Sequence, residues 1–204
     1  MLGRHDIRER LLDVAQDLVQ RRGINGMSFQ DLSDAVGIRK ASVHHHFASK
    51  TAMVSALLQR YRLEFRREVE LILGSRKSAA SKLKAYFGLF ASTLKQTGQD
   101  KGCLCGMLAA ELLSLEAENV EQVRGFFREN HRFIEQILND GRSDGSLAFP
   151  GETAAMARLV FSTLEGALLV ARCEGGVRSM ETMLESLLVL MVPASIKVGH
   201  KPTY

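Results

Sequence analysis

The chain has 204 residues, of which 46% are hydrophobic, so it can bury a core without disulfide or metal staples. A formal net charge of +4 favours a polyanionic partner without identifying one, and an odd number of cysteines, three, argues against a disulfide framework. The charged first ten residues lack the apolar core of a secretory signal, so we expect a cytoplasmic protein. The most apolar stretches, residues 154–171 and 183–192, are interrupted by Arg158, Glu165 and Glu185, so we expect no membrane span.

The spacing of apolar residues predicts an all-α protein of about nine helices. Prolines occur only at positions 150, 193 and 202, and apolar residues recur at steps of three and four through most of the chain. The predicted helices cover residues 6–22, 28–36, 40–47, 49–72, 81–96, 104–115, 120–140, 152–172 and 179–191. Turn signals separate the later ones, at 98–102, 140–141, 144–145, 149–151 and 175–176.

The first helices carry clear end signals. Gly23 ends the first, Ser28 with Asp31 three residues on is a capping-box variant, Gly37 breaks the second, and Ser49 is the expected N-cap of the long fourth helix. Two short helices thus flank a tight turn at residues 36–38. This arrangement allows the first of the two helices to support the second, which can then enter the major groove of DNA.

The segment from Arg8 to Met53 resembles the DNA-binding head of the TetR family of bacterial transcription regulators. The resemblance rests on order and spacing: after Gly23 come Met-Ser-Phe at 27–29, Leu-Ser-Asp-Ala-Val-Gly-Ile at 32–38, Lys-Ala-Ser-Val at 40–43 and Phe-Ala-Ser-Lys at 47–50. It implies a three-helix helix-turn-helix head at residues 1–50 and a helical ligand-sensing and dimerisation domain at 51–204. It also implies a repressor that a small-molecule or thiol-reactive effector releases from a pseudo-palindromic operator on double-stranded DNA.

The resemblance further identifies the residues expected at the DNA. Gln30 is placed to pair with adenine, and Lys50 is placed to grip a phosphate beside a helix N-terminus. The full expected set is Ser28, Gln30, Arg39, Lys40, Ala41, Ser42, His44, His45, His46 and Lys50.

The predicted recognition helix departs from the family at three positions. His44 and His46 stand where tyrosine is usual, and Arg39 replaces a capping serine and is expected to contact phosphate instead. Because protonation adds positive charge to a histidine, operator affinity is expected to fall as the pH rises from about 6 to 8. Neighbouring helical residues point about 100° apart, so the three histidines cannot converge on one ion, and we expect no metal and no cofactor.

Two alternatives stay open for this half of the chain. The basic residues of the fourth helix, Arg60, Arg62, Arg66 and Arg67, form either a solvated helix face or a DNA-binding surface. The head itself could also be a helical bundle that binds protein, although such a bundle does not explain the ordered series of family positions.

The last two long helices carry the expected dimer interface. Small residues allow close backbone approach and a broad apolar face follows; the set is Ser162, Gly166, Ala167, Met180, Met183, Leu184, Leu187, Leu188 and Met191. In the family such a pair forms a four-helix contact in a homodimer. The alternative is an ordinary internal core.

Residues 101–107, Lys-Gly-Cys-Leu-Cys-Gly-Met, resemble a segment of TetR-type regulators that answer to electrophiles through a cysteine, such as the N-ethylmaleimide- and acrylate-responsive repressors. On this resemblance Cys103 senses the effector, with Cys105 as a second candidate, and nearby Lys101 is expected to lower the pKa of the Cys103 thiol. The alternative is that these cysteines and Cys173 are packed apolar residues.

A ligand pocket is expected among the middle helices. The candidate lining residues, each of which could instead be plain core, are Tyr86, Phe87, Phe90, Met107, Glu111, Phe127 and His131. Two other functions compete with regulation. A thiol enzyme using Cys103 lacks an evident base, so we expect no enzyme, and an architectural or adaptor module would bind DNA without sequence preference.

Overall fold

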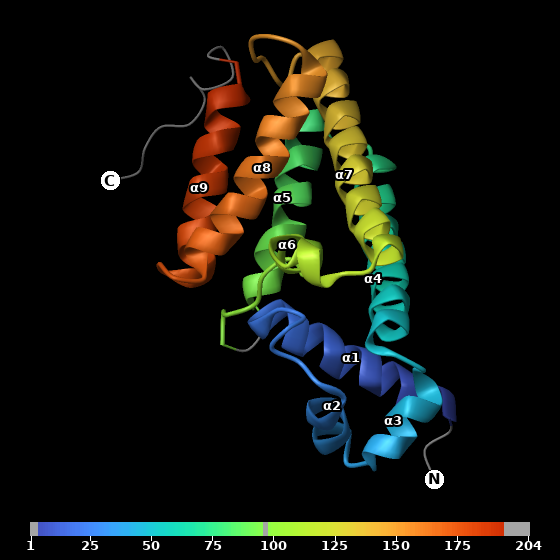
Figure 1. The fold of residues 1–204 in the computed structure, drawn as a ribbon. Helices are drawn as coiled ribbons and strands as arrows, with labels where there is room; N and C mark the ends of the chain where they lie inside the picture. Colours follow the sequence, from blue (N-terminus) through green and yellow to red (C-terminus); the bar gives the residue numbers. More distant parts are fainter. Residues whose placement is uncertain (1–3, 96–97, 194–204) are drawn as a thin grey trace. The chain divides into compact units, whose positions relative to one another are not determined.

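The computed structural model describes residues 4–95 and 98–193 of the chain. In these ranges every regular element is a helix, and no strand is present (Figure 1). The all-α prediction is therefore confirmed. The helices are α1 (Arg4–Arg22), α2 (Phe29–Val36), α3 (Lys40–His46), α4 (Lys50–Leu73), α5 (Ala79–Lys95), α6 (Leu104–Ala110), the 3-10 helix η1 (Leu112–Ser114), α7 (Ala117–Asp144), α8 (Thr153–Ala171) and α9 (Gly176–Met191). The predicted end of one helix at Gln96 and the outer ends of both predicted domains lie outside the described residues.

Most predicted boundaries hold within a few residues, and one predicted turn is wrong. The Asp140-Gly141 pair lies inside α7, which continues to Asp144 and ends at Gly145, where φ is +75°. Gly141 serves packing instead of a turn, because a Cβ at this position would lie 2.5 Å from the side chain of Leu147. The predicted helix 104–115 is divided into α6 and η1 at Glu111.

The chain forms two compact units. The first contains the described residues up to Phe65 together with Lys101–Phe126, and the second contains Arg66–Asp100 and the described residues from Phe127 onward. The long helices α4 and α7 each begin in the first unit and end in the second. The predicted division between residues 50 and 51 stays a prediction.

In the first unit, α1, α2 and α3 pack around a small apolar core. Leu11 and Val19 of α1, Leu32 of α2 and Val43 of α3 are fully buried. The helices start and end where the sequence predicts, because the capping groups are engaged. The Ser28 hydroxyl accepts the Asp31 amide at 3.2 Å and the Asp31 carboxylate accepts the Ser28 amide at 2.8 Å, which completes the capping box.

Two further caps fix the path of the chain around α3. Gly37 adopts φ +76° and its amide donates to the Ser33 carbonyl at 2.9 Å, so a left-handed residue turns the chain from α2 toward α3. The Ser49 hydroxyl accepts the Ala52 amide at 3.1 Å, which confirms Ser49 as the residue that opens α4.

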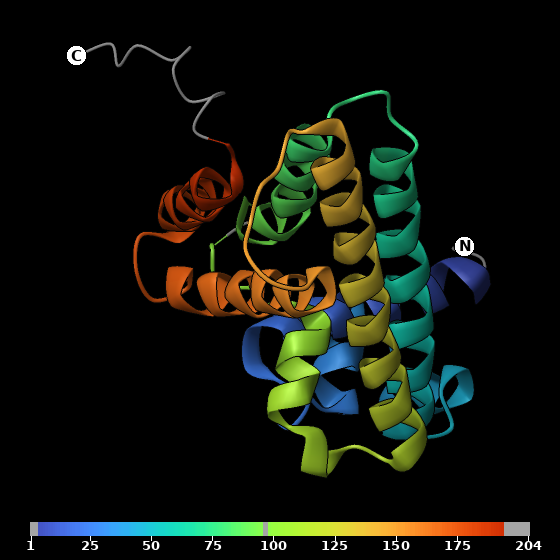
Figure 2. The same ribbon diagram turned by 90° about the horizontal axis from the view of Figure 1, so that it is seen from above.

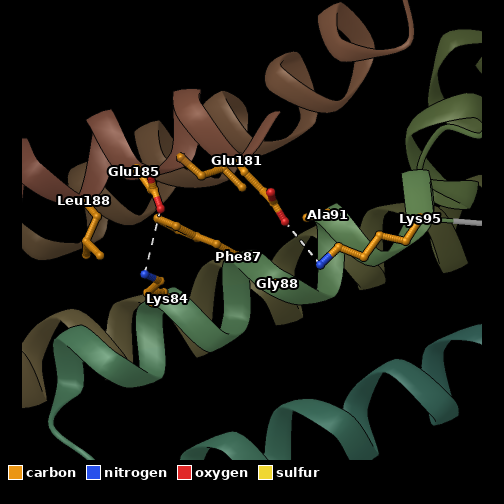
Figure 3. A pocket seen from close by; sticks show the side chains of 9 residues that line it. Lys84, Phe87, Gly88, Ala91, Lys95, Glu181, Glu185 and Leu188 are labelled. Carbon is orange, nitrogen blue, oxygen red and sulfur yellow. Dashed lines mark ion pairs between the residues drawn. The ribbon is translucent and has the colours of Figure 1, made fainter. Parts of the chain in front are cut away.

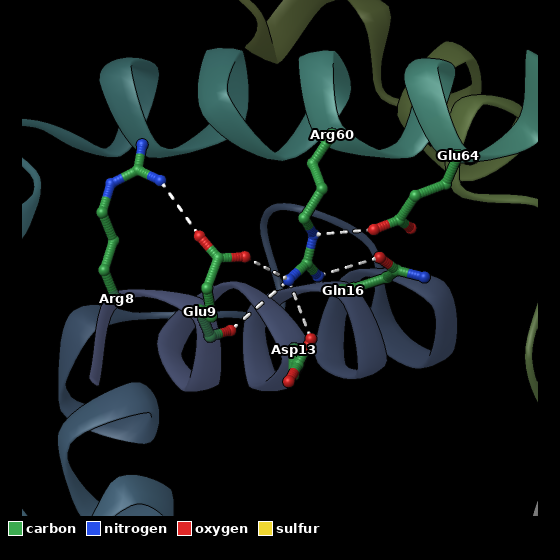
Figure 4. Close-up of polar contacts among 6 residues, drawn as sticks. All are labelled: Arg8, Glu9, Asp13, Gln16, Arg60 and Glu64. Carbon is green, nitrogen blue, oxygen red and sulfur yellow. Dashed lines mark hydrogen bonds and ion pairs between the residues drawn. The ribbon is translucent and has the colours of Figure 1, made fainter. Parts of the chain in front are cut away.

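Arg60 of α4 joins this helix to α1 through several polar contacts (Figure 4). Its guanidinium lies 3.2 Å from Glu9 Oε2, 2.8 Å from Asp13 Oδ1 and 3.2 Å from Gln16 Oε1. Neither alternative from the sequence describes Arg60, because its side chain is only 17% exposed and is used inside the protein. Arg66, further along α4, pairs with Glu129 at 2.6 Å.

In the second unit, α5, α8 and α9 pack on one another, and Figures 1 and 2 show α8 and α9 joined by the short turn at residues 172–175. The core is aromatic. The ring centroid of Phe161 lies 6.0 Å from that of Phe90, 5.6 Å from that of Phe127 and 5.2 Å from that of His131. Beside this cluster the buried Tyr86 hydroxyl donates a hydrogen bond to Asn130 Oδ1.

By length and composition alone, α8 is the one helix in the described ranges that is apolar enough to cross a membrane. The core helix of a globular unit meets the same criteria, so this observation is weak evidence for a span. Packing accounts for the buried side of α8, where Val160, Leu164 and Leu168 contribute to the core of the second unit.

Replacing Arg60 by alanine is expected to lower the free energy of unfolding by about 1–2 kcal/mol, because Glu9 and Asp13 lose their common partner in a partly screened site. Chemical denaturation followed by circular dichroism measures the change. Arg67→Ala is the matched control, since Arg67 is an exposed arginine of the same helix. Equal stability of the two variants would show that the Arg60 contacts contribute nothing.

Candidate nucleic-acid interface

The short helix α3 has one buried face and one exposed polar face. Val43 is fully buried and Phe47, directly after the helix, is 3% exposed, so these two side chains anchor α3 to the first unit. The five residues predicted to meet bases or phosphates are all exposed: Lys40, Ala41, Ser42, His44 and His45. The structure therefore gathers them on a single solvent-facing surface, as a helix that enters a DNA groove requires.

Residues next to α3 extend this surface. Arg39 is exposed and stands at the N-cap of α3 without a side-chain capping bond, as the sequence predicts. Gln30 is exposed on α2, and its amide donates to Asp34 Oδ1 at 2.8 Å. Ser28 is exposed but engaged, since it bonds to Asp31 and thereby lowers the pKa of that carboxyl group.

The three histidines of α3 have different neighbours. The His44 ring meets the edge of Phe29 at a centroid distance of 4.9 Å, and the rings of His45 and His46 lie 5.9 Å apart. His46 is only partly exposed. Within the described part of the chain, no three histidine, cysteine, aspartate or glutamate side chains group closely enough to hold a metal ion.

Lys50 has a partner inside the protein. Its ammonium donates to the Met27 carbonyl at 2.7 Å and so ties the start of α4 to the loop between α1 and α2. Burial lowers the pKa of Lys50, while the negative charges of Glu111 and Asp31 oppose this shift. The structure thus favours a supporting role for Lys50 inside the head in place of the predicted contact with phosphate.

The cysteine segment belongs to the same unit as α3. Cys103 is the N-cap residue of α6, is 3% exposed, and places its sulfur 3.8 Å from the Tyr61 hydroxyl. Cys105 is fully buried, whereas Cys173 in the second unit is exposed. Lys101, expected to act on the Cys103 thiol, forms an ion pair with Asp17 at 2.7 Å, and its effect on the thiol stays a prediction.

The predicted pocket residues are divided between the two units, and their role stays a prediction. Tyr86, Phe87 and Phe90 are buried in the second unit, where Phe127 and His131 are partly exposed, while Met107 is partly exposed in the first. Burial, with the positive charge of Arg158, lowers the pKa of His131. Glu111 lies in the first unit, where its carboxylate accepts the backbone amides of Ile24 and Asn25, and its place in a ligand pocket stays a prediction.

A groove with a volume of about 280 Å³ lies between α5 and α9 in the second unit (Figure 3). Apolar side chains including Phe87, Leu184 and Leu188 line it. Two ion pairs cross it, Lys95 with Glu181 at 3.2 Å and Lys84 with Glu185 at 4.0 Å. Sequence reasoning found only the apolar members, because the ion pairs join residues that are 86 and 101 positions apart.

The predicted dimer residues are distributed over the core and the surface. Ser162 and Gly166 are exposed on α8, and Met183, Leu187 and Leu188 are partly exposed on α9. The remaining members, Ala167, Met180, Leu184 and Met191, are buried inside the second unit, so the internal-core alternative describes their packing. The sequence missed the large exposed apolar residues Leu159, Leu169, Val170, Val189 and Leu190 on the same two helices.

A short helix with an exposed polar face, braced by a second helix across a tight turn, defines a helix-turn-helix DNA-binding protein. Residues 11–57 match the bacterial regulatory proteins of the tetR family, and residues 79–187 match the tetracyclin repressor-like C-terminal domain. The chain therefore belongs to the TetR family and is a DNA-binding transcription regulator.

Individual relatives agree with this assignment. The HTH-type transcriptional repressor NemR of Escherichia coli is 29% identical over 181 residues, which cover 88% of this chain and 91% of NemR. A TetR-family regulator from Agrobacterium tumefaciens has a TM-score of 0.88 at 29% identity, covering 94% of this chain and 100% of that chain. The reduced form of Escherichia coli NemR has a TM-score of 0.79 at 29% identity, covering 93% and 100%.

Lys40 and Lys50 are expected to differ in a salt titration of DNA binding. Lys40→Ala should reduce the slope of log affinity against log salt by about 0.9, the value of one lost phosphate contact. Lys50→Ala should leave the slope unchanged and lower the free energy of unfolding by about 1–2 kcal/mol, because the Met27 carbonyl loses a charged donor. A reduced slope at unchanged stability for Lys50→Ala would instead assign Lys50 to phosphate.

Proposed function

We propose that this chain is a repressor that binds a pseudo-palindromic operator as a homodimer and leaves it when an effector acts on the protein. The observation that carries the proposal is the exposed polar face of α3, with Lys40, Ser42, His44 and His45 held outward by the burial of Val43 and Phe47. Base edges and phosphates require side chains of this kind. The relatives named as repressors support the direction of regulation.

The exposed residues of α8 and α9 support a homodimer. On α8 the outward stripe consists of Leu159, Ser162, Gly166, Leu169 and Val170, which are apolar or small. On α9, Val189 is 55% and Leu190 is 78% exposed. Such an apolar surface is unfavourable in water, and pairing with the same surface of a second copy would bury it.

The effector is proposed to be a small molecule or a thiol-reactive compound, with Cys103 as the sensing residue. Support comes from the position of Cys103 at the start of α6 and from its contact with Tyr61 of α4, so that a group added to the sulfur must displace neighbouring side chains. Since the thiol is buried, the reaction requires a local opening of the segment. Cys105 is a second, fully buried candidate.

The same features support a binding protein instead of an enzyme. The family is one of regulatory proteins, and the Cys103 sulfur faces a tyrosine hydroxyl, which is a poor general base near neutral pH. As a transcription regulator it is proposed to act in the cytoplasm, at the chromosome.

Binding to the intergenic DNA upstream of its own gene tests the function. The wild-type protein is expected to bind its operator at least about 10³-fold more tightly than random duplex of the same length. A ratio near one would support an architectural or adaptor module instead. Leu169→Glu is expected to produce a monomer by analytical ultracentrifugation and to lose most of this affinity, whereas Leu71→Glu, at an exposed leucine of α4, should do neither.

Alkylation with N-ethylmaleimide tests the sensing residue. Modified wild-type protein is expected to lose operator affinity by at least tenfold, and Cys103→Ser should keep its affinity after the same treatment. Cys173→Ser is the matched control and should respond like wild type, because the exposed Cys173 thiol lies in the second unit. Mass spectrometry identifies the modified residue, and unchanged release in Cys103→Ser would reject the role.

A further inference from the structure

The segment that carries the cysteines is attached to α1 at its beginning. The Gln20 side-chain amide donates to the Gly102 carbonyl at 3.0 Å, and the Gly102 amide donates to the Gln20 carbonyl at 2.9 Å. Beside this reciprocal pair, Lys101 and Asp17 form their ion pair at 2.7 Å. The start of the segment is therefore held to the C-terminal half of α1 by groups of both backbone and side chains.

A second attachment lies at the end of α6, where Glu111 reaches the turn between α1 and α2. One carboxylate oxygen, Oε2, accepts the backbone amide of Ile24 and, at 3.1 Å, that of Asn25. The Asn25 side chain also donates to the Ser114 hydroxyl at 2.9 Å. These two amides follow the end of α1, and the Glu111 carboxylate supplies their acceptor.

The turn is shaped to admit the carboxylate. Gly23 adopts φ +77°, and a Cβ at this position would lie 2.6 Å from the carboxyl group of Glu111. A side chain at position 23 would therefore be strained by the backbone conformation and would require the Glu111 carboxylate to move. Lys50 bonds to Met27 in the same loop and experiences the negative charge of Glu111.

We propose that Glu111 is a positioning residue for operator binding: it fixes the α1–α2 turn that carries α2 and α3, and it couples the state of the Cys103 segment to that turn. The coupling part rests on the proposed thiol response, whereas the positioning part does not. The seven residues of α6 are all that separates Cys103 from Glu111. A displacement of the helix at Cys103 therefore moves Glu111 as well.

Hydrogen exchange and operator affinity test the positioning part directly. In Glu111→Ala the amides of Ile24 and Asn25 should exchange at least about tenfold faster, and operator affinity should fall about five- to tenfold while the helix content measured by circular dichroism is kept. Glu116→Ala is the matched control, since Glu116 is an exposed acid of the same segment. Faster exchange with unchanged operator affinity would overturn the proposal.

A double-mutant cycle separates positioning from a general loss of stability. Gly23→Ala displaces the carboxylate from the turn and also strains the backbone, so the double variant should lose less operator affinity than the sum of the two single losses. Additive losses would mean that the two residues act independently and would contradict the proposal. If Glu111→Ala does not fold, Glu111→Gln serves in the same cycle, since it removes the charge and keeps the shape.

Reciprocal linkage tests the coupling part. If the thiol state and the operator are coupled through Glu111, operator DNA should change the rate at which N-ethylmaleimide modifies Cys103. The ratio of the rates with and without DNA should approach one in Glu111→Ala. A full change retained in Glu111→Ala would overturn the coupling. Absence of any thiol effect in wild type would instead reject the sensing role of Cys103, and Glu111 would then be judged by amide exchange and operator affinity alone.

Discussion

A recognition helix of seven residues cannot hold its shape in water by itself, because isolated helices of this length are unstable. In this protein α3 keeps its conformation because Val43 and Phe47 are buried against the rest of the first unit. Its polar residues remain exposed, because Val43 and Phe47 occupy the side that packs against the unit. The proposed DNA-binding surface is thus a consequence of where two apolar side chains are anchored.

This dependence explains why so many polar contacts of the first unit converge on the supports of α3 instead of on α3 itself. Arg60 fixes α4 to α1, and Lys50 fixes the start of α4 to the loop before α2. Arg8 lies over the Phe47 ring at 5.1 Å, which holds the residue that ends α3 from the outside. Each contact is modest, but together they limit how far α3 can shift without unfolding the unit.

The sequence predicted the features of this structure that are local. The capping box at Ser28, the left-handed turn at Gly37 and the cap at Ser49 each depend on residues three or four positions apart, and all are confirmed. The residues of α3 expected at the DNA came from the resemblance to the TetR family instead of from such a pattern. The failed turn at Gly141 shows the limit, because a glycine needed for contact with Leu147 has the same sequence signature as one needed for a turn.

The contacts that the sequence did not predict join distant positions. Arg60 and Glu9 are 51 residues apart, and Glu111 and Ile24 are 87 apart. Periodicity carries no information on such pairs, since it describes only which face of a helix is apolar. The acids Glu9 and Asp13, four residues apart on α1, were the one available hint, as they present two negative charges on the side that Arg60 reaches.

Residues 101–126 belong to the same compact unit as the head, so the structure does not divide simply into a DNA-binding head and a separate sensing body. The proposed sensing thiol and the proposed recognition helix lie within one compact unit, so communication between them would need no transmission from the second unit. A buried thiol in that unit also imposes a requirement on chemistry. Since Cys103 is only 3% exposed, any reagent must first find the segment open, and each contact that docks the segment on α1 opposes this opening. The packing that makes the head rigid enough to recognise DNA would therefore also set how readily the thiol reacts.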